Sequence, residues 1–123
     1  MSSIGSFEAA RELVTQPGSL LEVGQVDVAG QSLLGYVNAP ASMRDLWMLA
    51  TGHGDAEYMV YLDERMTYSD AAIRVAAFAS WLQGQGIGPG DRVAIAMRNY
   101  PEWMLAHWAI NAIGAVVVGL NAW

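Results

Sequence analysis

The feature that most constrains the fold is the stretch Gly86–Trp123, which predicts a strand, a helix and a second strand in that order. A Gly-Pro-Gly-Asp turn precedes a short apolar strand over Arg92–Met97. Asn99 is the expected N-cap of the helix, Pro101 falls in its first turn, and Gly114 ends it. The β-branched run that follows lacks polar alternation, which is typical of a strand buried on both faces. Two such strands joined by a helix predict a parallel βαβ unit.

The predicted helix of this unit is apolar around almost its whole circumference. Only Glu102, His107 and Asn111 interrupt the apolar surface. A helix that is apolar on all sides is buried on all sides, and one sheet covers only one of them. We therefore predict an inner helix of a multi-layered α/β protein, with Trp103 and Ile110 largely buried.

Residues 1–39 predict an N-terminal arm made of a helix and a β-hairpin. The helix is expected over 7–15, and two strands over 22–28 and 31–37. Ala29-Gly30 suits a tight two-residue turn between them. The resulting register predicts two facing pairs, Val26 with Leu33 and Val23 with Tyr36.

Residues 40–123 predict the α/β portion of a larger domain. A helix is expected from the Ser42 cap to Thr51, followed by a strand over Glu57–Leu62. The pair Asp63-Glu64 is expected to form a turn, and its carboxylates are interpreted as solvated. Arg65-Met66 is the expected return strand.

A second long helix is predicted to begin after Thr67, because Asp70 three residues on completes a capping box. It carries two apolar stripes. The broad one, which we expect to pack on a sheet, contains Tyr68, Ala71, Ala72, Val75, Phe78, Ala79 and Leu82. The narrow one on the opposite side contains Ile73, Ala77 and Trp81.

No residue of the chain is predicted to be catalytic, cofactor-binding or metal-binding. The alternating Gly84, Gly86, Gly88 and Gly90 match no phosphate-loop pattern and precede a strand rather than follow one, so a helix C-cap and a turn are the better interpretation. His53 with Asp55 is more consistent with a surface loop than with a metal site, because the chain has two histidines and no cysteine.

His107 allows two interpretations: a general base, or a core histidine bonded to the backbone or to Asn111. The second is favoured. No G-x-S-x-G motif is present.

Composition indicates surfaces that something else covers. Hydrophobic residues make up 54% of the chain and charged residues 15%, against about 25% in an average globular protein. We therefore expect self-association. The net charge of −6 disfavours nucleic acid as a partner. Trp103–Trp123 carries no formal charge, but its glycines and asparagines favour a helix–strand pair over a membrane span. No secretory signal is visible, which predicts a cytoplasmic protein.

Several short motifs follow one another along the chain in an order that resembles a known family. They are Thr67-Tyr68-Ser69-Asp70, Gly-x-x-Pro-Gly-Asp-Arg-Val-Ala-Ile from Gly86, Asn99-x-Pro101-Glu102, an alanine-rich helix, Gly114-Ala115-Val116 and Leu120-Asn121. Together they are similar to the N-terminal region of the adenylate-forming enzymes of the AMP-binding superfamily. These include acyl-CoA synthetases, aryl-CoA ligases, luciferases and peptide-synthetase adenylation domains. The resemblance covers roughly 40–123 and is strongest to bacterial fatty-acid–CoA ligases, although Gly119 stands where many members have proline.

The resemblance implies an N-terminal fragment of an ATP-dependent acyl-CoA synthetase, which converts a carboxylic acid, ATP and CoA to acyl-CoA, AMP and pyrophosphate. ATP, Mg²⁺ and CoA would serve the full-length enzyme, with a fatty acid as substrate and the remainder of the chain as partner. The family's ATP loop and its lysines would lie downstream of Trp123, so this chain alone is expected to be inactive scaffold. The alternative is a free-standing, non-catalytic α/β association module.

Overall fold

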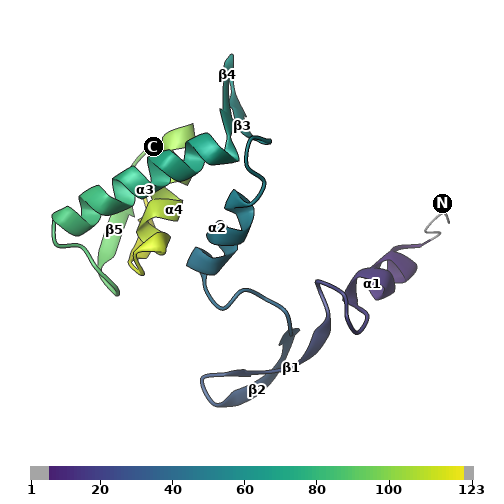
Figure 1. Cartoon of the computed structure of the whole chain (residues 1–123). Coiled ribbons are helices and arrows are strands. Elements are labelled where there is room, and N and C mark those ends of the chain that lie inside the picture. Colours follow the sequence, from purple (N-terminus) through teal and green to yellow (C-terminus); the bar gives the residue numbers. More distant parts are fainter. Residues whose placement is uncertain (1–5, 121–123) are drawn as a thin grey trace. The chain divides into compact units, whose positions relative to one another are not determined.

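The computed structural model describes residues 6–120 and contains two compact units, Met1–Pro40 and Ala41–Trp123. Asn121 and Trp123, which belong to the motifs and the strand predicted at the end of the chain, lie outside the described residues. Mixed helices and small sheets make up the chain, as predicted (Figure 1). The assignment of the two units as an arm and as part of an enzyme domain stays a prediction.

The first unit contains helix α1 (Phe7–Thr15) and the antiparallel hairpin β1 (Val23–Val28) and β2 (Gln31–Tyr36). The predicted pairs Val26 with Leu33 and Val23 with Tyr36 are present in the register. Ala29 and Gly30 both have positive φ, 53° and 81°, which is the backbone of a type I′ turn. No residue of α1 is buried within the structure, so this unit has little core of its own.

The second unit holds the core. Its elements are α2 (Met43–Thr51), β3 (Glu57–Tyr61), β4 (Glu64–Thr67), α3 (Tyr68–Gly84), β5 (Arg92–Ile95), α4 (Pro101–Ala112) and β6 (Val116–Gly119). Helix α4 contacts α2 and α3 and also both strands β5 and β6, which confirms the predicted inner helix (Figure 1). Ile110 is completely buried there, and Trp103 is partly buried and packs against the core. Trp103 also stacks on the ring of His107, one helical turn away.

Strands β5 and β6 pair in parallel, with Arg92 opposite Val116 and Ile95 opposite Gly119. The predicted βαβ unit is therefore confirmed. Strand β5 is shorter than the predicted Arg92–Met97, because its ladder with β6 ends at Ile95. Within residues 6–120 the sheet has two strands, so each strand has one edge without a neighbour.

Two predicted boundaries are wrong for local reasons. The N-cap of α4 is Tyr100, not Asn99, and it makes no side-chain cap bond. Pro101 holds the residue before it in extended backbone, which ends the non-helical segment at Tyr100. The turn predicted at Asp63-Glu64 lies one residue earlier, because Leu62 takes the positive φ (53°) and β4 already starts at Glu64.

Helix α3 begins with the predicted capping box. The Thr67 hydroxyl accepts a hydrogen bond from Asp70 N at 3.1 Å, and the Asp70 carboxylate accepts bonds from the Thr67 hydroxyl and amide. These bonds lower the pKa of Asp70, the side-chain bond most. Helix α3 packs mainly on α4, and also on α2 and the β3–β4 hairpin, so helices cover more of it than the sheet that was predicted for its broad stripe. The small side chains of Ala71 and Ala79 allow this close helix packing.

Helices α3 and α4 end in the same glycine-based C-cap. After α3, Gly86 N donates to the Gln83 carbonyl at 2.9 Å and Ile87 N to the Leu82 carbonyl at 3.1 Å. After α4, the equivalent bonds are Gly114 N to Asn111 O at 3.0 Å and Ala115 N to Ile110 O at 3.1 Å. Both glycines have positive φ, and the pair of bonds defines a Schellman motif at each helix end.

The two caps predict a graded response to alanine. Gly86→Ala should cost about 1–2 kcal/mol from the left-handed backbone alone, since nothing lies within 4 Å of the added Cβ. Gly114→Ala should cost about 1 kcal/mol more, because its Cβ would lie 3.3 Å from the Pro89 Cβ. Urea unfolding followed by circular dichroism measures both. Equal losses for the two variants would contradict the contact with Pro89.

Candidate functional site

The glycine-rich segment between α3 and β5 is the first place to test for a nucleotide site. Its amide groups already donate within the chain: Gly86 N to Gln83 O at 2.9 Å, Gly88 N to the Asp91 carboxylate at 2.9 Å, and Gly90 N to Gly114 O at 2.9 Å. A phosphate cradle needs free amide groups that point at the anion. A carboxylate also occupies this turn. The segment therefore does not fit the phosphates of ATP.

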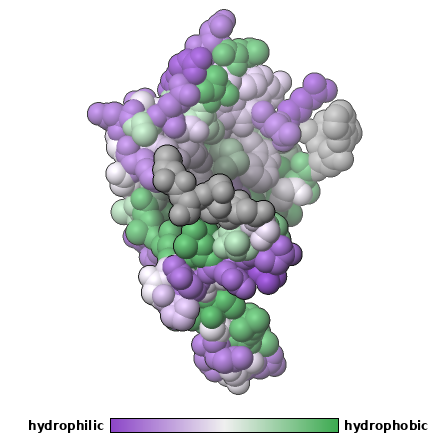
Figure 2. Space-filling view, turned by 90° about the vertical axis from the view of Figure 1, so that its right-hand side faces the viewer, coloured by the Kyte–Doolittle hydropathy of each residue, from purple (hydrophilic) through white to green (hydrophobic). Residues whose placement is uncertain are grey.

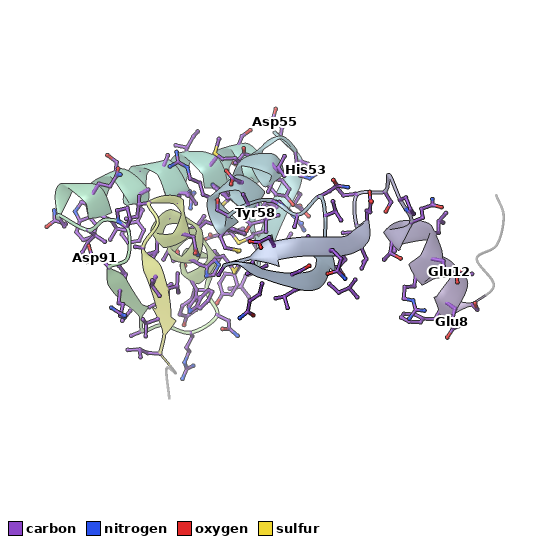
Figure 3. The ribbon with its side chains drawn as sticks, turned by 90° about the horizontal axis from the view of Figure 1, so that it is seen from below. Glu8, Glu12, His53, Asp55, Tyr58 and Asp91 are labelled. Atoms are coloured by element: carbon purple, nitrogen blue, oxygen red, sulfur yellow. The ribbon has the colours of Figure 1, made fainter. Side chains whose placement is uncertain are left out.

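The acidic and histidine side chains of the second unit do not gather into one site. His53 packs on the ring of Tyr68 at 4.9 Å, in the exposed loop after α2. Asp55 lies near it, and Asp91 lies at the opposite end of this unit (Figure 3). Among residues 6–120, no group of three His, Cys, Asp or Glu side chains could hold a metal ion. The described residues thus do not fit Mg²⁺.

His107 lies between two tryptophans on α4. Its ring stacks on Trp103 at 5.5 Å and meets the edge of Trp108 at 5.3 Å. Its Nδ1 is buried and has no hydrogen-bond partner among the described residues. Burial lowers the pKa of His107, so the neutral imidazole is favoured at pH 7. The predicted bond between His107 and Asn111 is present through the backbone and not through the imidazole: Asn111 donates to the carbonyl of His107 at 2.8 Å, the usual reach of a side chain to the preceding turn.

An aromatic cluster connects α2, β3 and α4. Trp47 stacks on Trp108 with ring centroids 5.1 Å apart, and both approach Tyr58. The indole Nε1 of Trp108 donates to the Tyr58 hydroxyl at 2.7 Å. Burial raises the pKa of Tyr58, which keeps the phenol neutral. This cluster is internally satisfied and serves packing.

A cleft of about 410 Å³ lies between α2 and α3. Helix α2 contributes Arg44, Trp47, Met48 and Thr51, which recur on one helical face. The end of α4 contributes Ala112, and its C-cap Ile113 also lines the cleft. The α3 wall is built from small residues, among them Ala72, Ala76 and Ala79. The sequence did not predict this cleft, because Ala72 and Ala79 were interpreted as contacts to a sheet and Ala76 was assigned to neither apolar stripe. The signal that could have indicated the cleft is the row of small α3 residues at helical spacing, opposite a row of larger residues on one face of α2.

Membrane-spanning structure is not found in the described part of the chain. None of its helices is long and apolar enough to cross a bilayer. The uncharged stretch from Trp103 divides into α4 and β6, as the sequence predicted.

Comparison with known proteins places these features in a family. The AMP-binding enzyme family matches residues 46–122, more than half of the chain. A medium/long-chain-fatty-acid–CoA ligase of Mycobacterium tuberculosis, FadD6, is 34% identical over 113 residues, covering 89% of this chain and 19% of its own. The pyochelin synthetase PchE of Pseudomonas aeruginosa is 32% identical over 78 residues, covering 63% of this chain and 5% of its own.

A solved structure shares the fold. The N-terminal subdomain of Klebsiella oxytoca NpsA superposes with a TM-score of 0.63 at 28% identity, covering 66% of this chain and 22% of that chain. The chain therefore spans about a fifth or less of the length of these relatives. Fold, motif order and sequence identity agree with the resemblance that the motifs indicated. The chain belongs to the AMP-binding enzyme family, whose members form adenylates.

Proposed function

We propose that this chain is the N-terminal part of an ATP-dependent acyl-CoA synthetase that acts in the cytoplasm. The whole enzyme would join a carboxylic acid, with fatty acids as the favoured class, to AMP with release of pyrophosphate. It would then transfer the acyl group to CoA. The observation that carries this choice is the extent of similarity: the match to FadD6 covers 89% of the chain, whereas the match to PchE covers 63%.

The part of the chain described here would act as scaffold. The amide groups of Gly86, Gly88 and Gly90 are used in a helix cap and in turn contacts, and the sequence contains no lysine to contact a phosphate. Contacts to ATP, Mg²⁺ and CoA would come from the remainder of the protein. This chain would supply α4 and the β5–β6 pair, against which further layers pack.

A chimera tests the proposal. The N-terminal segment of FadD6 that aligns with this chain is replaced by it, and fatty-acid-dependent ATP–pyrophosphate exchange and acyl-CoA formation are measured. We expect both activities to persist, because the grafted segment carries scaffold and no reacting group. A parallel chimera in the PchE adenylation region controls for general tolerance. A folded FadD6 chimera without activity, beside an active PchE chimera, would refute the acyl-CoA assignment and favour a peptide-synthetase origin.

The isolated chain should show no acid-dependent ATP–pyrophosphate exchange. The physical reason is the lack of free amides in the glycine turns and of any lysine. The exchange assay with radiolabelled pyrophosphate and a panel of fatty acids measures this. Intact FadD6 in the same buffer is the positive control. Exchange that copurifies with the chain through two chromatographic steps would contradict the scaffold role.

The second candidate, an association module, is favoured by one observation. The narrow stripe of α3 is exposed: Ile73 at 71% and Trp81 at 57%, with Phe78 stacked on Trp81 at 5.6 Å. Hydrophobic side chains also reach the surface elsewhere in the chain (Figure 2). Such a face suits contact with another polypeptide, whether a further part of the enzyme or a separate protein.

The same stripe leads us to expect self-association of the isolated chain. Trp81→Arg should shift the species seen by light scattering after gel filtration toward monomer, because it places a charge in the stripe. Gln85→Arg adds the same charge at an exposed position beyond the helix and should leave the distribution unchanged. A stable monomer at roughly 100 μM that Trp81→Arg does not alter would contradict the prediction.

A further inference from the structure

We infer that the exposed stripe of α3 is a two-fold contact between two copies of this chain, in which the two α3 helices pack antiparallel and cross at Ala77. The stripe consists of Ile73, Ala77 and Trp81. The inference gives a partner and a geometry to the self-association expected for the second candidate function, on which it rests. It is independent of the acyl-CoA synthetase assignment, so either can fail without the other.

The stripe has the same large–small–large order when it is read in either direction. Its three residues follow one another four positions apart, so they form one ridge on the exposed side of the helix. A two-fold interface brings the same surface of each copy together. In an antiparallel pair centred on Ala77, Trp81 covers Ile73 of the second copy and the two Ala77 side chains meet at the crossing. These small side chains let the helix axes approach to about 8 Å.

Trp81 is already held in place for such a contact. Its ring stacks on Phe78 at 5.6 Å, with 12° between the two ring planes. Phe78 is in turn partly buried and packs against the core. One face of the indole is thus covered within the chain, and the exposed remainder is available to a second copy. A ring fixed before binding loses little conformational entropy on association, and tryptophan is among the residues that dominate binding energies at interfaces.

The charges of α3 favour an antiparallel over a parallel pair. Asp70 and Arg74 are the two charged residues of the helix and both lie in its first half, whereas the second half, which holds Trp81, has none. A parallel pair would set each charge opposite its own copy, and like charges in contact oppose association. The antiparallel pair sets the charged half against the uncharged half and also opposes the two helix dipoles favourably.

The area of the stripe predicts a weak dimer. A fully covered aromatic side chain removes about 150–250 Å² from water. Two half-exposed Trp81 rings and two Ile73 side chains therefore bury several hundred Å² in total. This is below the roughly 1,200 Å² at which stable complexes begin. We expect a dissociation constant on the order of 100 μM, which makes the dimer reversible and dependent on concentration.

Disulfide cross-linking tests the geometry, because the chain contains no cysteine and each substitution introduces a single reporter. Ala77→Cys should form a linked dimer under mild oxidation, since an axis separation of about 8–10 Å puts the two Cα atoms within disulfide range. Gly84→Cys should not, because position 84 lies seven residues from the crossing and its two copies would be about 21 Å apart. A parallel pair would cross-link at both positions.

Ala76→Cys is the control for random collision. Ala76 is exposed like Ala77, but its side chain is turned about 100° around the helix and away from the stripe. We expect it to cross-link at least tenfold more slowly than Ala77→Cys at the same protein concentration. Circular dichroism should be the same for all three cysteine variants, because none of the substituted positions is buried.

Sedimentation equilibrium over roughly 10 μM to 1 mM measures the strength of the contact. Trp81→Ala should raise the dissociation constant about tenfold or more, because it removes the large side chain from both ends of the two-fold contact. Leu49→Ala is the matched control. Leu49 is an exposed apolar residue of α2, so the same kind of truncation there should leave the dissociation constant unchanged.

Several results would overturn the inference. They are a monomer over the whole concentration range, equal cross-linking at positions 77 and 76, equal cross-linking at positions 77 and 84, and association that survives Trp81→Ala. In the last case, loss of association in Leu34→Arg would assign the contact to the exposed β1–β2 hairpin instead. None of these outcomes changes the expected activity of the chimera, and an inactive chimera would not alter cross-linking of the isolated chain.

Discussion

Ile110→Ala should lower the free energy of unfolding by about 3–5 kcal/mol. Ile110 is completely buried and lies on α4, which contacts helices α2 and α3 and strands β5 and β6. Removal of its side chain leaves a cavity. Several packed elements would have to move at the same time to fill this cavity, so the structure can relax only in part. Urea unfolding followed by circular dichroism, at a concentration where the chain is monomeric, measures the loss.

A matched control exists on α3. Ile73→Ala makes the same chemical change at a side chain that is 71% exposed, so the effect should stay within about 0.5 kcal/mol. A loss below about 1 kcal/mol for Ile110→Ala would show that α4 is not an inner helix. Equal losses in the two variants would lead to the same conclusion.

Trp47→Ala should cost about 3–5 kcal/mol. Trp47 is 3% exposed, stacks on Trp108 at 5.1 Å and lies 5.8 Å from Tyr58, so it packs α2 onto the core through two aromatic contacts. Without it, α2 loses its one buried side chain. The near-ultraviolet circular dichroism of the aromatic cluster should weaken along with the stability.

The control for this change is Trp81→Ala. Trp81 is 57% exposed and contacts Phe78, so we expect a loss of about 1 kcal/mol or less. Since a domain of this size has about 5–15 kcal/mol of stability in total, the two variants should separate clearly in urea midpoint. If Trp81→Ala proved as damaging as Trp47→Ala, the exposed stripe of α3 would be part of an interface already formed in solution.

Local signals predicted most of the element boundaries. Thr67 and Asp70 fix the start of α3 through bonds between residues three apart, and Gly114 fixes the end of α4 through its own positive φ. The hairpin register followed from a two-residue turn at Ala29. Each of these depends on atoms close in sequence, so a single chain is enough to recognise them.

Contacts between elements far apart in the chain could not be predicted from the sequence. The alanine-rich face of α3 suits a sheet and a helix equally well, and only the position of α4 decides between them. The cleft depends on the divergence of α2 from α3, which no periodicity records. His107 was expected to find a ring partner, and its Nδ1 has none because two tryptophans occupy the space around it.

The parallel pairing of β5 and β6 has a consequence during synthesis on the ribosome. Strand β5 has no hydrogen-bonded neighbour in the described chain until α4 and β6 have also been made, because the two strands are adjacent in space but separated by the helix. At about 5–20 residues per second, that delay lasts roughly one to five seconds. During it, the apolar α4 has been made but β6, one of the two strands that contact it, has not. We therefore expect this nascent segment to expose apolar surface that a chaperone at the exit tunnel could bind.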